Sequence, residues 1–206
     1  MLKPATSLSN DFVSHLRYLE QTRSKMEKYV RQDLLVRRDI EQVYAGLYVE
    51  IVASFERFLE NLFVELLVKK VRCGQISVKP KMLFPSRDMA REIINGGRKY
   101  VDWLPYENHT EKRAKIFIFD GLPFTSLSQA NKKQLDEVLL IRNAIAHKSK
   151  HALHQFNVKV ISGLSLTTSE RTPCGFLRSV ARNSPQQTQY EVRVLVLAEI
   201  ASVLCA

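Results

Sequence analysis

An arginine, an asparagine and a histidine lie close together in one short stretch of the sequence. Arg142 and Asn143 are adjacent, and His147 follows four residues after Asn143. In an α-helix this spacing places the Asn143 and His147 side chains on one face. A guanidinium offers phosphate a permanent charge and a planar set of donors, and a free imidazole exchanges protons near neutral pH. The three residues could therefore bind a phosphate ester and move a proton beside it.

A structural interpretation of the same residues remains open. Arg142 lies about 140° around an ideal helix from His147, so its long side chain has to swing over to reach the imidazole. Arginine, asparagine and histidine also occur at helix ends as caps and solvated charges. A histidine near a helix C-terminus is favoured by the helix dipole alone.

Helical periodicity predicts the elements that position these residues. Apolar residues recur at helical spacing in several segments, and the Arg142–His147 stretch falls in the last turns of one of them. We therefore predict an all-α fold, a bundle of four or five helices with a long central helix and irregular insertions. The expected helices cover residues 8–30, 39–72, 87–94, 129–148 and 190–204, with shorter helical pieces at 151–156 and 176–181.

The segment from about Asp39 to Arg72 is predicted to be the central helix. It contains no proline, and its apolar residues form a face wider than one buried stripe. Such a face must be buried against more than one neighbour, so we expect it at the centre of the bundle and extending into a subunit interface.

Two stretches are predicted to be irregular. Residues 73–121 are interrupted by prolines and glycines, and the apolar run Ile116–Phe119 within them could be a strand or a packed helix. Residues 164–189 are rich in Ser, Thr, Pro and Gln and indicate a loop. We predict one domain over 1–206, with a core at about 39–160 and a loop plus a C-terminal packing helix over 161–206.

The charge distribution favours a polyanionic partner. The 206 residues carry a formal charge of +10. Seven Lys or Arg against one acid, Glu170, lie between residues 142 and 182, and phosphate neutralisation is the obvious use of such a stretch. A solvated basic loop is the alternative. As RNA contacts we select Lys148, Lys150, Arg171 and Arg178.

The chain resembles the HEPN superfamily, whose signature is an arginine, usually followed by asparagine, and a histidine four to six residues after the arginine. Arg142, Asn143 and His147 match it. The stretch Phe55–Leu62 is similar to the helix opposite that motif. Further similarity to the subfamily associated with RNA ligase and phosphatase genes covers residues 44–204, through segments such as Gly121–Phe124 and Glu170–Pro173.

The resemblance implies a metal-independent endoribonuclease that works as a homodimer. His147 would take the proton of the ribose 2′-OH, Arg142 would stabilise the phosphate, and Asn143 would orient His147 or a phosphate oxygen. Glu56 could pair with Arg142 or hold His147 in one tautomer, although a surface ion pair is an equal alternative for this carboxylate. The products would be 2′,3′-cyclic phosphate and 5′-OH ends.

We expect the protein to act as a toxin or an anti-phage defence effector. Its regulator would be an antitoxin or another partner protein. Two other interpretations remain open. One is a HEPN module that binds RNA or a partner protein without cutting it. The other is a structural helical protein whose basic surface binds a membrane or an acidic partner, which lacks support because no amphipathic segment has lysines along one face.

The sequence predicts no metal and no cofactor. His147, His151 and His154 would share one face of a continuous helix, but no nearby Cys or Asp completes a ligand set, and the neighbouring lysines repel a cation. Three scattered cysteines, no signal sequence and no apolar span predict a cytoplasmic protein without membrane contact.

Overall fold

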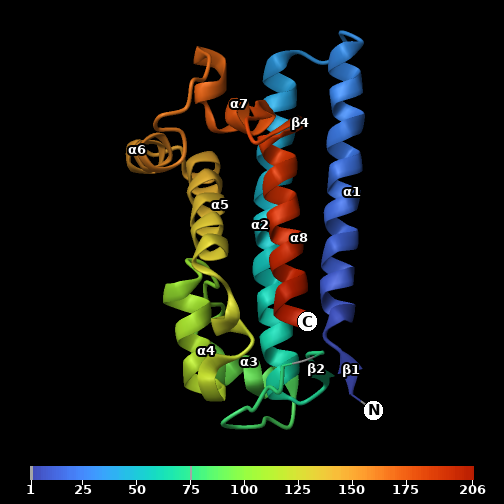
Figure 1. The fold of residues 1–206 in the computed structure, drawn as a ribbon, viewed down its shortest axis with the longest axis vertical. Coiled ribbons are helices and arrows are strands. Elements are labelled where there is room, and N and C mark those ends of the chain that lie inside the picture. The colour runs from blue at the N-terminus through green and yellow to red at the C-terminus, as the bar shows by residue number, and fades with distance from the viewer. Residues whose placement is uncertain (1, 75) are drawn as a thin grey trace. The chain divides into compact units, whose positions relative to one another are not determined.

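The chain folds into helices joined by short irregular segments, in agreement with the predicted all-α class (Figure 1). The computed structural model describes residues 2–74 and 76–206. Its α-helices are α1 (Thr6–Arg31), α2 (Arg37–Leu67), α3 (Arg87–Asn95), α4 (Lys112–Phe117), α5 (Gln129–His147), α6 (Lys150–Lys159), α7 (Pro173–Arg178) and α8 (Gln189–Cys205). One π-helix (Glu107–Glu111) and three 3₁₀ helices (Phe119–Gly121, Phe124–Ser126 and Thr168–Arg171) complete the helical part.

Two short sheets accompany the helices. Strands β1 (Lys3–Pro4) and β2 (Val71–Arg72) pair in parallel, whereas β3 (Val180–Ala181) and β4 (Ser184–Thr188) form an antiparallel hairpin. The hairpin lies where the sequence indicated a loop. Strand β3 has only two residues, and those of β4 are mostly polar and exposed or half-exposed, so the hairpin carries no alternating apolar pattern from which a strand could be predicted.

The contacts within the chain divide it into two compact units. Unit 1 contains the residues up to 13, residues 54–135 and residues 198–206, and unit 2 contains residues 14–53 and 136–197. The expectation of a single domain over 1–206 stays a prediction.

Aromatic side chains form much of the core of unit 1. The ring of Phe12 lies 5.7 Å from that of Phe55, measured between centroids, and the ring of Phe63 lies 5.3 Å from both Trp103 and Phe124. All five side chains are buried. The wide apolar face predicted for the central helix is thus buried inside the chain itself in this unit.

The predicted end of the central helix was five residues too late. Helix α2 stops at Leu67, Lys69 adopts a left-handed conformation with φ of 51°, and the chain continues into β2. The Ile116–Phe119 run combines both predicted alternatives. It ends α4 at Phe117, and Ile118 then forms an extended bridge to Pro80.

Three buried tyrosines mark the core of unit 2. The rings of Tyr44 and Tyr48 from α2 lie 5.4 and 6.4 Å from that of Tyr190 at the start of α8. Burial raises the pKa of Tyr44 to about 12, so its hydroxyl remains a hydrogen-bond donor at neutral pH.

Helix α7 begins three residues before the predicted piece at 176–181. Thr172 caps it by accepting a hydrogen bond from the Gly175 backbone N–H. A Cβ atom at Gly175 would lie 2.0 Å from the Ser169 carbonyl oxygen, so only glycine allows the chain to fold back this closely.

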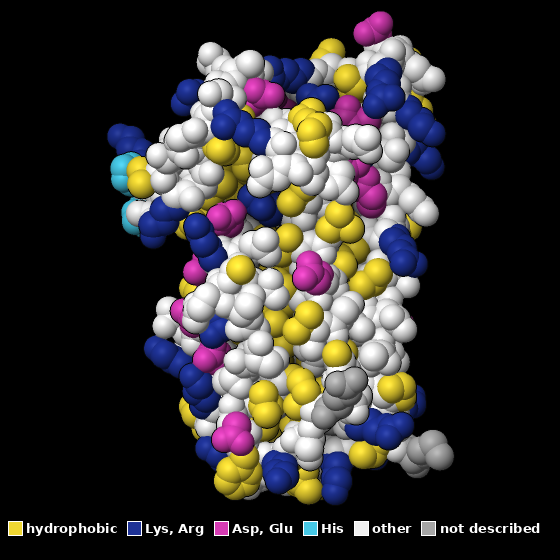
Figure 2. All heavy atoms as spheres, in the orientation of Figure 1, with side chains coloured by type: hydrophobic (Ala, Val, Ile, Leu, Met, Phe, Trp, Pro, Cys, Tyr) yellow, Lys and Arg dark blue, Asp and Glu magenta, His cyan; other side chains and the backbone are white. Residues whose placement is uncertain are grey.

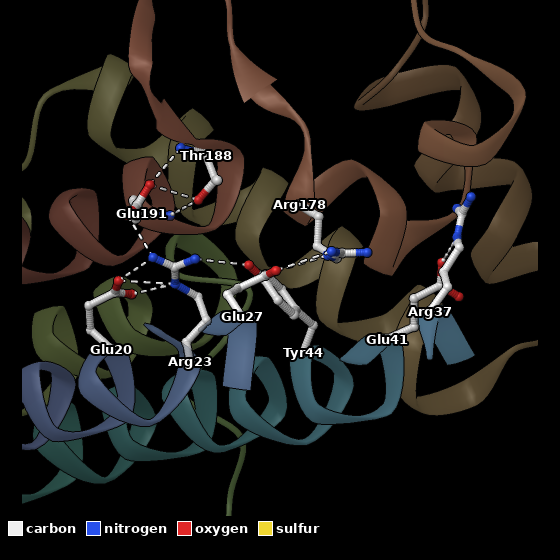
Figure 3. A network of polar contacts seen from close by, with 9 residues as sticks. All are labelled: Glu20, Arg23, Glu27, Arg37, Glu41, Tyr44, Arg178, Thr188 and Glu191. Carbon is white, nitrogen blue, oxygen red and sulfur yellow. Dashed lines mark hydrogen bonds and ion pairs between the residues drawn. The ribbon is translucent and has the colours of Figure 1, made fainter. Parts of the chain in front are cut away.

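An ionic network, which we call the arginine network, attaches the region around α7 and α8 to α1 and α2 within unit 2 (Figure 3). Its members are Glu20, Arg23, Glu27, Arg37, Glu41, Tyr44, Arg178, Thr188 and Glu191. Arg23 donates to Glu20, to Glu191 at 2.7 Å and to the Tyr44 hydroxyl at 3.0 Å. Arg37 donates to Glu41 and to the Ser169 carbonyl oxygen, both at 2.8 Å.

Candidate functional site

The predicted motif occupies the C-terminal end of α5. Burial of Ile141, Ala144 and Ile145 fixes one face of this helix against the core of unit 2. Arg142 and Asn143 are half-buried at the border of that face, and His147 is exposed as the last residue of the helix. The predicted helix at 129–148 is therefore confirmed to within one residue.

Arg142 and Asn143 contact each other directly. One Nη atom of Arg142 donates to the Asn143 Oδ1 atom at 3.1 Å, which restrains the guanidinium. The ring of His147 has no hydrogen-bond partner among the described residues. Asn143 thus positions Arg142, and the predicted contact between Asn143 and His147 is not among the hydrogen bonds of the described residues.

A sharp turn follows the motif. Lys148 has a positive φ of 48°, which ends α5. Ser149 then caps α6 by accepting from the Ala152 backbone N–H at 3.1 Å, so α6 leaves α5 in a new direction (Figure 1). The predicted helical piece at 151–156 lies within this helix.

The turn and the first residues of α6 gather cations and imidazoles at one edge of unit 2. Lys148, Lys150, His151 and His154 are all exposed. Figure 2 shows histidine side chains next to lysine or arginine side chains at the position of α6. Because the turn at Lys148 separates His147 from α6, the three histidines do not share one continuous helix.

The cations around this turn, Arg142, Lys148 and Lys150, have no ion-pair partners among the described residues. Burial raises the pKa of the nearby Cys174 thiol to about 11, and the Glu41 carboxylate adds to that shift, whereas Lys148 acts in the opposite direction. The site therefore presents an exposed imidazole and three cations that no carboxylate of the described residues pairs with.

The structure separates the four predicted RNA contacts into two kinds. Lys148, Lys150 and Arg171 are exposed. Arg178 instead donates to the two carboxylate oxygens of Glu27 at 3.0 and 3.2 Å, with 26% of its side chain exposed. Although burial raises the pKa of Glu27, the hydrogen bonds from Arg178 and Tyr44 and the charges of Arg178 and Arg23 together outweigh that effect and lower it. Arg178 is thus engaged in holding unit 2 together.

Glu56 lies in unit 1, whereas the motif belongs to unit 2. Its half-buried carboxylate accepts a hydrogen bond from the Trp103 backbone N–H at 3.3 Å. This contact gives Glu56 a structural role within unit 1. A contact with Arg142 or His147 stays a prediction.

The sequence reasoning missed Arg23, the centre of the arginine network. Only 9% of its side chain is exposed. A signal was present, because Arg23 continues the spacing of the buried residues Phe12, Leu16 and Leu19 along α1. A charged residue in an apolar stripe needs polar partners, and here they come from α1 itself, from α2 and from α8.

Neither a metal site nor a membrane span is found in the described part of the chain. No group of three or more His, Cys, Asp or Glu side chains there is arranged to hold a metal ion. Nor is any of its helices both long and apolar enough to cross a membrane.

No known protein family, characterised protein or solved structure matches this chain. The HEPN resemblance therefore rests on the sequence alone. A functional proposal has to rest on the geometry at the end of α5.

Proposed function

We propose that the protein is an endoribonuclease whose active site includes Arg142 and His147. The observation that carries this proposal is an exposed imidazole at the end of α5, five residues after a restrained guanidinium and next in the chain to two exposed lysines, with no carboxylate of the described residues paired to these cations. A polyanion bearing a hydroxyl next to each phosphate, which is RNA, suits this set of groups.

The chemistry requires only imidazole and guanidinium groups and the RNA. His147 accepts the proton of a ribose 2′-OH, and the 2′-oxygen forms a bond to the adjacent phosphorus while the bond from phosphorus to the 5′-oxygen breaks. Arg142 stabilises the negative charge that develops on the non-bridging phosphate oxygens. The 5′-oxygen takes a proton from a protonated imidazole, so the products are a 2′,3′-cyclic phosphate and a 5′-OH.

A homodimer would supply that second imidazole from the other protomer. The wide apolar face of α2, from which an interface was expected, offers no support for such a dimer. Tyr44, Ile51 and Phe55 on that helix are fully buried within one chain. A dimer contact has to use another surface, and we place it at the exposed end of α5, where two imidazoles could approach one RNA strand.

The test is cleavage of labelled transfer RNA in the presence of EDTA. The wild-type protein should produce 2′,3′-cyclic phosphate ends and leave DNA of the same sequence intact. His147→Ala should lose about 10²–10⁴-fold in rate, the usual contribution of a general base. His154→Ala is the matched control, since this exposed histidine lies on α6 outside the motif, and it should cut at the wild-type rate.

Arg142→Lys separates charge from geometry. It keeps the cation and removes the planar fork that Asn143 restrains, so cleavage should fall while RNA binding remains. Cleavage that is equal in wild type, His147→Ala and Arg142→Lys would contradict the proposal.

One observation favours a second function, a module that binds RNA without cutting it. No described residue forms a hydrogen bond to the His147 ring, and catalytic imidazoles are usually held in one orientation by a second group. RNA binding that is equal in wild type and His147→Ala, with no cleavage by either, would establish this function instead.

A further inference from the structure

A cavity of about 550 Å³ in unit 1 differs from the cavities of unit 2 in its charges. Lys69, Arg72 and Lys79 line it, and none of the described residues that line it is Asp or Glu. No ion pair is formed by any of these three cations with a described residue. We call it the basic cavity.

The cavities of unit 2 show the contrast. One is lined by Arg182 and Arg193 together with Glu137 and Glu170, and Arg193 pairs with Glu137 at 3.0 Å. Another includes Arg178 with its partner Glu27. A third contains the single cation Arg171. Three unpaired cations around one hollow are therefore specific to the basic cavity among these four.

Most of the other side chains of the wall are aliphatic, with Ser77 as a polar member. Its apolar members come from the N-terminal segment, the end of α2, β2 and the chain that follows: Leu2, Leu66, Val71, Ile76, Val78 and Leu83. No aromatic residue is among the described lining residues, so the cavity offers no platform on which a nucleic-acid base could stack. An aliphatic chain is the apolar group that fits such a wall.

The backbone holds the cations in place before any ligand arrives. The Ala5 N–H donates to the Arg72 carbonyl oxygen at 2.8 Å through the β1–β2 pairing, and the Phe119 N–H donates to the Lys79 carbonyl oxygen at 2.9 Å. The Lys69 N–H donates to the Leu66 carbonyl oxygen at 3.2 Å. Binding therefore needs to order only the side chains at the cavity, which lowers its entropic cost.

We propose that the basic cavity binds an anionic amphiphile, a molecule with a phosphate or carboxylate headgroup on an aliphatic chain. The headgroup contacts Lys69, Arg72 and Lys79, and the chain lies against the aliphatic wall. A volume of about 550 Å³ lies within the range of small-molecule sites. The site lies entirely in unit 1, which contains neither Arg142 nor His147, so it does not depend on the proposed ribonuclease activity.

The experiment is calorimetric titration of the full chain with decyl phosphate below its micelle concentration. We expect one molecule bound per chain. Inorganic phosphate, which lacks the chain, and decyl maltoside, which lacks the charge, should each bind at least about tenfold more weakly, equivalent to ~1.4 kcal/mol. Equal binding of inorganic phosphate would overturn the proposal, because the aliphatic wall would then contribute nothing.

Charge-reversal variants locate the site. Lys79→Glu and Arg72→Glu should each weaken decyl phosphate binding about tenfold, ~1.4 kcal/mol. Lys112→Glu is the matched control, an exposed cation of unit 1 that is not among the cavity residues, and it should bind as wild type does. An equal loss in the control would show attraction to net charge alone and would overturn the proposal.

Leu83→Asn tests the wall without changing the charge of the cavity. Leu83 is 54% exposed, so the variant should fold, as circular dichroism can verify. It should lose decyl phosphate binding, and unchanged binding would overturn the proposal. Displacement of decyl phosphate by a short single-stranded RNA would overturn it too, since the surface would then be a nucleic-acid site.

A second experiment, with lipid vesicles, distinguishes a membrane lipid from a free amphiphile as the ligand. Sedimentation with phosphatidylglycerol vesicles, lost in Lys79→Glu, would support the site and identify a membrane lipid as its ligand. Binding of the monomer without sedimentation would support a free amphiphile.

Discussion

Arg178 and Lys150 carry the same charge in the same unit, but the structure surrounds them differently. Arg178 is half-buried and donates to the Glu27 carboxylate across 151 residues of sequence. Lys150 is exposed at the start of α6 and has no ion pair among the described residues. The excess of positive charge in residues 142–182 therefore contains two populations, of which one is neutralised within the fold and the other is available to a ligand.

The number of basic residues in a sequence therefore differs from the number available to a ligand. The arginine network contains three arginines and four glutamates, so it adds no net positive charge to the surface. The end of α5 and the start of α6 contribute cations without such partners. Counting Lys and Arg overestimates the surface available to RNA wherever the arginines are paired inside the fold.

Removal of Arg23 should have the largest effect on stability. Arg23→Leu would leave Glu20, Glu191 and the Tyr44 hydroxyl without their shared partner in a largely buried place. We expect the free energy of unfolding to fall by about 3–5 kcal/mol, the usual cost of removing one member of a buried ionic cluster. Urea denaturation followed by circular dichroism measures it.

The matched control is Arg17→Leu, an exposed arginine on the same helix without an ion pair among the described residues. Its effect should stay within about 0.5 kcal/mol, as for surface substitutions generally. Similar losses in both variants would mean that the arginine network does not stabilise unit 2 more than any surface arginine does.

The salt dependence of RNA binding tests whether Lys150 and Arg178 contact phosphate. Lys150→Ala should lower the slope of log K against log salt concentration by about 1, the contribution of a single phosphate contact. Arg178→Ala should leave that slope unchanged, because Glu27 already occupies this guanidinium. For Lys148, the better variant is Lys148→Asn, since asparagine tolerates the positive φ of this residue.

Filter binding of a single-stranded RNA at several salt concentrations gives these slopes. If Arg178→Ala lowers the slope as much as Lys150→Ala does, the ion pair with Glu27 opens in the complex and the division into two populations is wrong. Arg171→Ala belongs with the exposed set and should behave as Lys150→Ala does.

Local patterns were sufficient to predict much of the fold. Helix α3 was predicted to within one residue, because Ser86 caps its start and Gly96 adopts the left-handed conformation after its end. The position of Arg142, Asn143 and His147 at the end of α5 also followed from local periodicity. The spacing of residues along a helix is a local property, so a single stretch of sequence is enough to predict it.

Partners distant in the sequence could not be predicted in the same way. Nothing near Arg178 indicates that Glu27 of α1 will accept its hydrogen bonds, and nothing near Glu56 indicates the Trp103 backbone N–H. The end of α2 was misplaced for a related reason. Residues 68–72 have an acceptable helical composition, but the pairing of β2 with β1 takes their backbone out of the helix.

Lowering the pH tests whether the carboxylates that pair with arginines inside the fold stabilise it. The pKa of Glu27 is lowered from its ordinary value of 4.5, so Glu27 binds protons less readily in the folded chain than in the unfolded chain. A carboxylate whose pKa is lower in the folded chain than in the unfolded chain stabilises the fold above pH 4.5. This stabilisation is lost as the pH falls through the pKa of the folded chain. The free energy of unfolding of the wild-type protein should therefore decrease below pH 4.5.

Glu27→Gln separates this contribution from the remaining carboxylates. At neutral pH the variant should be less stable than wild type, because the ion pair with Arg178 is lost, and the difference should narrow as the pH falls below 4.5. Glu199→Gln, an exposed carboxylate on α8, should keep a constant difference across the same range. A constant difference for Glu27→Gln as well would mean that the charge of Glu27 does not stabilise the fold. The hydrogen bonds from Arg178 to Glu27 would then hold unit 2 without a contribution from the charge of that carboxylate.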